Sequence, residues 1–161
     1  KSHIFIMFDS YSLITLSPLV RNYFPLKNII VWDKVNIGMG HYFRRQSEFI
    51  LFSSKGKKPI SNRSTNDVWS IKRIVRSKYP TQKPVELFSK MIFASKLKNE
   101  KNLIVCDPFL GSGSAAIAAL KLNCNFIGGD ISKTAIKISK ERIDTFLRKK
   151  IDILEEKKIK K

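Results

Sequence analysis

The fold of this chain is decided by residues 107–114, which read Asp-Pro-Phe-Leu-Gly-Ser-Gly-Ser. An apolar run at 103–106 precedes this segment and an alanine-rich run at 114–122 follows it, which predicts a strand, a loop and a helix. Glycine lets the backbone of such a loop turn tightly and approach a ligand closely. The first turn of the helix offers free N–H groups and a positive dipole end, which suit a carboxylate or a phosphate.

The next predicted strand, at 125–129, leads directly into Asp130. An acidic residue at this place usually accepts hydrogen bonds from ribose hydroxyls in nucleoside-binding α/β sheets. Gly111 and Gly113 match the dinucleotide fingerprint only loosely, because alanine stands at the third glycine position. The loop alone therefore leaves two alternatives open, an NAD-binding domain and a tight turn without a ligand.

Strand-like and helix-like patterns alternate along the rest of the chain, which predicts an α/β fold with a mostly parallel sheet. A glycine-rich loop is expected at 36–45, and the polar, basic segment 55–78 is expected to be a loop or a small inserted element. Proline at position 18 weakens the first predicted helix. The five predicted strands are 3–8, 28–35, 48–52, 103–106 and 125–128, and the helices are 11–23, 83–97, 114–122 and 133–147.

The composition points to a polyanionic partner. Lys and Arg number 31 and Asp and Glu number 13, which gives a net charge of +18 in 161 residues. A charge of this size on one small chain favours nucleic acid through counterion release, although a solvated basic tail is the simpler explanation. Cys106 and Cys124 lie in apolar stretches and are expected to be buried, reduced thiols of a cytoplasmic protein. No apolar run is long enough to predict a membrane span.

Three groups of residues together resemble the DNA amino-methyltransferases, which methylate N6 of adenine or N4 of cytosine. Residues 107–113 resemble the cofactor motif of these enzymes, and the upstream stretch Tyr-Pro-Thr-Gln-Lys-Pro-Val-Glu-Leu at 79–87 resembles their second cofactor-contacting motif. Residues 30–34, 38–40 and 44–52 are similar to the late motifs of the catalytic half. The match departs modestly at Ser114 and Ala115, where Thr-Thr is common, and at Gly129.

The resemblance implies a Rossmann-like S-adenosylmethionine-dependent methyltransferase sheet in the circularly permuted order of the β group, with the catalytic half first. We expect an incomplete methyltransferase domain at 1–147, with 55–78 as a variable segment for target recognition, and a basic C-terminal tail at 148–161. The family's catalytic motif is Asp-Pro-Pro-Tyr or a close relative, and no Pro-Pro pair occurs in the sequence. We expect the catalytic residues upstream of Lys1, on strand-and-helix units of roughly 60 residues.

The resemblance also implies roles for individual residues. Thr81 and Lys83 would reach the methionine carboxylate of S-adenosylmethionine, and Asp107 would lie near its amine. Simpler alternatives are a turn-capping carboxylate for Asp107, core packing for Phe109 and a helix cap for Asp130. The expected cofactor-binding residues are Thr81, Lys83, Asp107, Phe109, Gly111, Ser112, Gly113 and Asp130.

The expected substrate is double-stranded DNA, and Lys34, Arg44 and Arg45 are the expected phosphate contacts. In the family, the target base is flipped out of the duplex before its amine is methylated. We expect a site-specific DNA methyltransferase of a restriction-modification or phage system, with N6 of adenine favoured and this chain alone inactive. An RNA amino-methyltransferase and an inactive DNA-binding remnant remain open, as do a dimer and a complementing chain. No metal site is expected.

Overall fold

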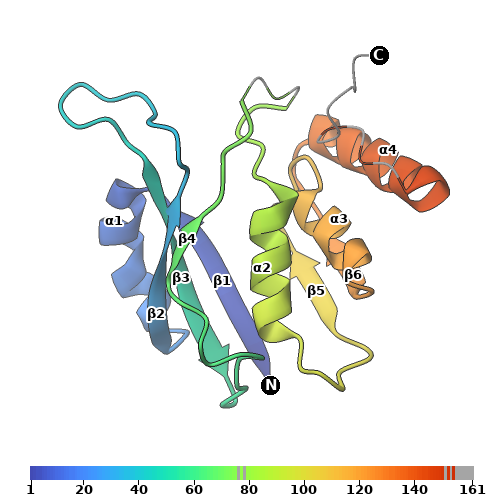
Figure 1. Cartoon of the computed structure of the whole chain (residues 1–161), viewed down its shortest axis with the longest axis horizontal. Helices are drawn as coiled ribbons and strands as arrows, with labels where there is room; N and C mark the ends of the chain where they lie inside the picture. The colour runs from blue at the N-terminus through green and yellow to red at the C-terminus, as the bar shows by residue number, and fades with distance from the viewer. Residues whose placement is uncertain (76, 78, 151, 153, 155–161) are drawn as a thin grey trace. The chain divides into compact units, whose positions relative to one another are not determined.

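The computed structural model describes residues 1–75, 77, 79–150, 152 and 154. The chain divides into two compact units, Lys1–Arg73 and Ile74–Lys161. Each unit has its own sheet, and Figure 1 shows the first in blue to green and the second in green to red. No helix in the described part of the chain is long and apolar enough to cross a membrane.

The first unit is a four-stranded sheet with one helix against it. Its strand order is β1-β3-β2-β4, in which β3 runs antiparallel to both β1 and β2, and β4 runs parallel to β2. Helix α1 contacts β1 and β3. The elements are β1 (Ser2–Phe8), α1 (Ser10–Arg21), β2 (Leu26–Asp33), β3 (Ser47–Lys55) and β4 (Val68–Ser70).

Two tryptophans form the centre of this unit's core. Trp32 on β2 is 1% exposed, and Trp69 on β4 is 2% exposed. Each indole N–H donates to a backbone carbonyl, that of Trp32 to Ile71 O at 2.7 Å and that of Trp69 to Asn66 O at 2.8 Å. These bonds satisfy the polar end of each buried ring.

The structure corrects two expectations for the first unit. The sheet is not mostly parallel, because no helix lies between β2 and β3 and the chain therefore returns alongside β2 in the opposite direction. Segment 55–78 contributes the short strand β4, which the sequence did not predict because its three residues lie in a mostly polar stretch. The helix predicted at 11–23 forms despite Pro18, and the Asp9 carboxylate caps it by accepting from Ser12 N at 2.7 Å.

The second unit places three helices around two parallel strands. The strands are β5 (Ile104–Asp107) and β6 (Asn125–Gly128), and the helices are α2 (Val85–Ser95), α3 (Ser114–Lys121) and α4 (Lys133–Lys149). Helix α3 contacts both strands and both of the other helices (Figure 1). Its small alanine side chains are buried, which lets the neighbouring elements approach it closely. The core of the unit comprises Val85, Ile92, Ile117, Ala118, Ala119, Cys124 and Phe146.

One cysteine is placed differently from the expectation. Cys124 is buried, but Cys106 is exposed. Successive side chains of a strand point to opposite faces of its sheet, and Ile104 and Cys106 on β5 share the face that is exposed to solvent. An apolar run therefore predicted the strand correctly but not the burial of both its faces.

The start of the expected basic tail belongs to the folded unit. Helix α4 continues through Lys149, and Asp152 is only 2% exposed. The lysine-rich residues at 157–161 lie outside the described residues.

Candidate functional site

The loop between β5 and α3 is hydrogen-bonded to the end of β6. Gly129 N donates to the backbone oxygen of Asp107 at 3.0 Å, and Leu110 N donates to Gly129 O at 2.9 Å. The Asp107 carboxylate also accepts from Phe109 N at 3.0 Å, which is the turn-capping role considered from the sequence. The two parallel strands thus bring the predicted glycine loop and the predicted acid to the same end of the sheet.

Both glycines of the loop have backbone conformations that side chains rarely adopt. Gly111 has φ +51° and Gly113 has φ +82°. A Cβ on Gly113 would lie 3.1 Å from Ser139 Cβ on α4, closer than ordinary packing. Gly113 is also the N-cap of α3, and no side chain among the described residues caps that helix. The backbone N–H groups of its first turn are therefore suited to an anionic ligand.

The Asp130 carboxylate is hydrogen-bonded to the loop at Gly111. Its Oδ2 accepts from Gly111 N at 2.8 Å and its Oδ1 accepts from Ser132 N at 2.9 Å. These two N–H groups, Ser132 first, hold the pKa of the Asp130 carboxyl below its usual value. The ionised carboxylate keeps lone pairs for hydroxyl donors. The cap of α4 is Ser132 rather than Asp130, because the Ser132 hydroxyl accepts from Ala135 N at 3.3 Å.

Asp107 has the opposite electrostatic environment. Burial raises the pKa of its carboxyl, the N–H of Phe109 opposes this rise, and the negative charge of Asp130 adds to it. A carboxylate that is disfavoured by burial and by a neighbouring anion is stabilised by a cationic ligand. Asp130 is therefore a firmly ionised acid, whereas the ionised form of Asp107 would be stabilised by a nearby cation.

The segment 79–83 lies against the same loop. The ring of Tyr79 lies 3.6 Å from the position that a Cβ on Gly111 would occupy. Lys83 O accepts from the Ser114 hydroxyl at 2.7 Å, and Thr81 has φ +59°. Gln82 is buried, and its Nε2 has no hydrogen-bond partner among the described residues. The two predicted motifs are thus adjacent, and a buried donor close to them has no partner among the residues that the structure describes.

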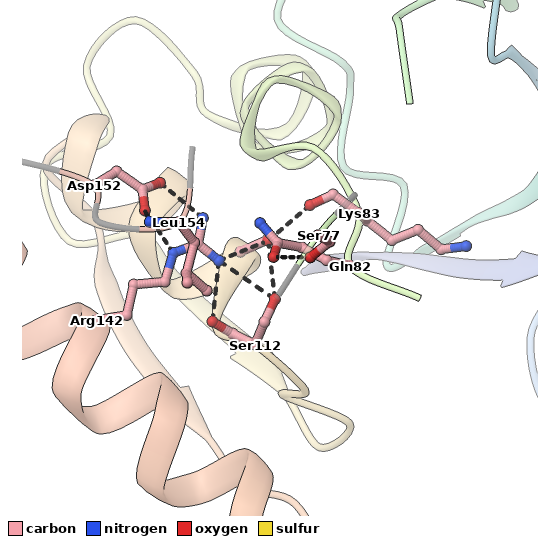
Figure 2. A network of polar contacts seen from close by, with 8 residues as sticks. Ser77, Gln82, Lys83, Ser112, Arg142, Asp152 and Leu154 are labelled. Carbon is pink, nitrogen blue, oxygen red and sulfur yellow. Dashed lines mark hydrogen bonds and ion pairs between the residues drawn. The ribbon is translucent and has the colours of Figure 1, made fainter. Parts of the chain in front are cut away.

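Figure 2 shows the polar contacts of Arg142, which is hydrogen-bonded to the loop at Ser112. Arg142 on α4 is completely buried, and its Nε and Nη2 each donate to a carboxylate oxygen of Asp152 at 2.7 Å. Its Nη1 donates to Ser112 O at 3.0 Å and lies 3.3 Å from the Ser112 hydroxyl and 3.0 Å from that of Ser114. Burial raises the pKa of Asp152, but the hydrogen bonds and charge of Arg142 outweigh it and lower the pKa below its usual value.

Arg142, Asp152 and Ser114 were not among the cofactor-binding residues predicted from the sequence. A lone arginine in a charged helix is usually solvated, so nothing in the sequence distinguishes Arg142 from the other basic residues of α4. Ser112, a predicted cofactor residue, is buried and engaged by Arg142. Phe109 is 86% exposed and is therefore not part of the core.

The expected phosphate contacts lie in the first unit and differ in exposure. Lys34 is buried, and its ammonium lies 3.4 Å from the Glu48 carboxylate. Arg44 and Arg45 are exposed on the loop between β2 and β3. The Arg44 Nε donates to Gly38 O at 2.9 Å, and the Arg45 guanidinium lies 4.9 Å from the centre of the Tyr11 ring. The structure therefore presents the two arginines, but not Lys34, to solvent.

The sequence model of the N6/N4 methyltransferases, described as DNA methylase, matches residues 2–141. This chain belongs to the N6/N4 DNA methylase family. Among solved structures, the M1.HpyAVI–SAM complex is 32% identical with a TM-score of 0.67, and the match covers 88% of this chain and 74% of that one. The cytosine-N4-specific PvuII DNA methyltransferase has the same TM-score of 0.67 at 12% identity, which shows a shared fold alone.

Curated members of the family are similar over most of this chain. Type II methyltransferase M2.MboI of Moraxella bovis is 31% identical in an alignment 144 residues long that covers 77% of this chain and 52% of that protein. M2.DpnII of Streptococcus pneumoniae is 30% identical over 142 residues, with 75% and 52% covered. The DNA methylase chain described here therefore spans about half the length of these curated relatives.

The ion pair behind the loop predicts how a single substitution changes local dynamics. Asp152→Asn leaves the buried guanidinium without its counter-charge, and breaking a buried pair costs about 3–5 kcal/mol. We expect hydrogen exchange of the amides at 110–114 to accelerate at least about tenfold. Asp144→Asn, which removes an exposed acid from the same helix, is the control. Equal exchange rates in the two variants would contradict the proposed restraint of the loop by Arg142.

Proposed function

We propose that the whole protein transfers a methyl group from S-adenosylmethionine to an exocyclic amine of a DNA base, and that this chain binds the cofactor. The observation that carries the proposal is the convergence of three groups at one end of β5 and β6. These are the left-handed glycine loop, the uncapped start of α3 and the ionised carboxylate of Asp130. Membership of the DNA methylase family supports the same assignment.

The residues present fit the cofactor chemically. Asp130 keeps acceptor capacity for ribose hydroxyls, and the start of α3 suits a carboxylate. The raised pKa of Asp107 fits a partner that carries a positive charge, such as the methionine amine. The Nε2 of Gln82, which has no hydrogen-bond partner within the described part of the chain, adds one buried donor to the motif that contains Thr81 and Lys83. When bound, S-adenosylmethionine supplies an electrophilic methyl group.

Each part of the site then has a defined task. Asp130 would bind the ribose and Asp107 would attract the methionine amine, so that two separate parts of the cofactor would be held. Thr81 and Lys83 would bind the methionine carboxylate, and they lie on a segment that is hydrogen-bonded to α3 through Ser114. Gly111 and Gly113 allow the backbone to approach without obstruction. Phe109, which is exposed on this loop, would pack beside the bound cofactor. Alignment of this kind supplies much of the rate in a methyl transfer.

Double-stranded DNA is the proposed substrate of the whole protein. The net charge of +18 favours a polyanion, and Arg44 and Arg45 present guanidinium groups to solvent. N6 of adenine is the proposed target, in a restriction-modification or phage system within the cytoplasm. The group that accepts the hydrogen bonds of the target amine is proposed to come from outside these residues. The chain alone is therefore expected to be inactive or nearly so.

Cofactor binding is the first test of this proposal. Calorimetry with the 161-residue chain is expected to detect S-adenosylmethionine or its demethylated product and not NAD. Gly111→Val places a β-branched residue at φ +51° and Asp130→Ala removes the carboxylate, so each is expected to weaken binding at least about tenfold. Asp144→Asn is the control, and thermal melts establish that each variant is folded. Unchanged affinity in both site variants would refute the assignment of the site.

The pKa of Asp107 predicts a pH dependence of cofactor affinity. Its pKa is raised, so its carboxylate takes up a proton as the pH falls from neutral at a higher pH than an ordinary aspartate does. Protonation removes the charge that attracts the amine, and affinity is therefore expected to fall on acidification. The lowered pKa of Asp130 keeps that group ionised over the same range.

Calorimetric titrations between about pH 4 and 8 measure this dependence. Asp107→Asn is expected to bind more weakly near neutral pH and to show a flatter profile, because no charge is left to lose. A variant profile that matches the wild-type profile in shape would assign the pH dependence to another group and contradict this role for Asp107.

A further inference from the structure

The loop between β2 and β3 has a tip, residues 38–45, that is held by hydrogen bonds within the loop. Gly38 N donates to Arg45 O at 2.8 Å, and the side chain of Arg44 donates back to Gly38 O at 2.9 Å. A Cβ on Gly40 would lie 2.5 Å from Phe43 O, so the turn requires glycine at that position. Hydrogen bonds between Gly38 and the two arginines therefore close the tip at its base.

This closed tip exposes its largest apolar side chains. Met39 is 88% exposed, Tyr42 is 90% exposed and Phe43 is 95% exposed. A loop that needed only to connect two strands could use polar residues here, whereas adjacent exposed aromatics usually mark a contact surface. The His41 ring packs edge-on against Tyr42 with centroids 5.0 Å apart, which leaves Phe43 without a ring partner in the described part of the chain.

The charges around the tip indicate what it contacts. No acidic residue occurs between Asp33 and Glu48, and the exposed arginines 44 and 45 directly follow the two aromatics. An apolar protein surface offers no counter-charge for these guanidinium groups, and the match of residues 2–141 to the DNA methylase family favours nucleic acid over an anionic lipid surface. Nucleic acid offers both complements, because phosphates pair with arginine and every base has a face on which an aromatic ring can stack.

We propose that Tyr42 and Phe43 stack on bases that become exposed in the DNA, while Arg44 and Arg45 bind the adjacent phosphates. The inference rests on the proposed function, because an enzyme that modifies a base must first take it out of the stack. Aromatic side chains that occupy the opened step offset part of this unstacking free energy. The tip is thus a base-stacking site that assists opening of the duplex, separate in sequence from the cofactor motifs.

The test is equilibrium binding of the 161-residue chain to a short DNA duplex over a series of salt concentrations. Tyr42→Ala/Phe43→Ala is expected to weaken binding at least about fivefold at every salt concentration without changing the slope of log K against log salt. Arg44→Gln/Arg45→Gln is expected to flatten this slope by as much as about 1.8, or about 0.9 for each lost phosphate contact. Tyr23→Ala, an 80% exposed tyrosine outside the loop, is the control and is expected to bind like the wild type.

A mismatched duplex separates stacking from general apolar contact. Its bases unstack more easily, so the wild type is expected to bind it more tightly than the matched duplex, and the Tyr42→Ala/Phe43→Ala variant is expected to lose this preference. A preference that survives in the variant would overturn the inference, as would unchanged affinity for the matched duplex. Failure of the wild type to bind any duplex would instead refute the proposed DNA substrate, and with it this inference.

Sedimentation of the wild type and of the aromatic variant tests a protein partner for the same surface. The inference predicts the same oligomeric state for both proteins. A wild-type dimer that dissociates in the variant would show that a second copy of the chain covers the tip, and would overturn the base-stacking role.

Discussion

A guanidinium group that is completely removed from solvent needs a hydrogen-bond acceptor for each N–H that it buries. Arg142 finds these acceptors in Asp152 and in the loop that leads into α3, and its hydrogen bonds hold that loop in place. Its fork binds both carboxylate oxygens of Asp152, and its remaining nitrogen binds Ser112 and Ser114 at the start of α3. Breaking such a pair is costly because an uncompensated charge stays buried. Arg142 thereby restrains the loop at Ser112 and Ser114, and the Asp130 carboxylate restrains it at Gly111.

The two units contribute different chemistry. The second unit, Ile74–Lys161, gathers the glycine loop, two acids in opposite electrostatic states and the segment 79–83 around one end of two parallel strands. The first unit, Lys1–Arg73, exposes aromatic and basic side chains at the tip of the loop between β2 and β3. Cofactor binding and nucleic-acid contact are thus assigned to different parts of the chain.

The sequence predicted the local structure around the proposed site. The left-handed turn at Gly111 and Gly113 and the place of Asp130 beside it could be predicted, because a tight turn between a strand and a helix requires glycine and because the next parallel strand ends beside that turn. The binding roles of these residues stay predictions. Arg142 and Asp152 could not be found, because their pairing depends on how α4 packs and follows no periodic pattern. Strand β4 was missed because its three residues lie in a mostly polar stretch. The exposure of Cys106 was missed because an apolar run does not reveal which face of a strand is covered.

The central claim is that this chain of the N6/N4 DNA methylase family binds S-adenosylmethionine at the loop that Arg142 and Asp130 restrain. Titration of the ¹⁵N-labelled chain with S-adenosylhomocysteine, followed by two-dimensional NMR, tests it most directly, because each backbone amide reports separately. The account predicts that the largest shifts fall on Gly111, Gly113 and the residues flanking Asp130, with smaller shifts at 79–83 and almost none in Lys1–Arg73. Shifts confined to the first unit, or no saturable shift at the two glycines, would contradict it.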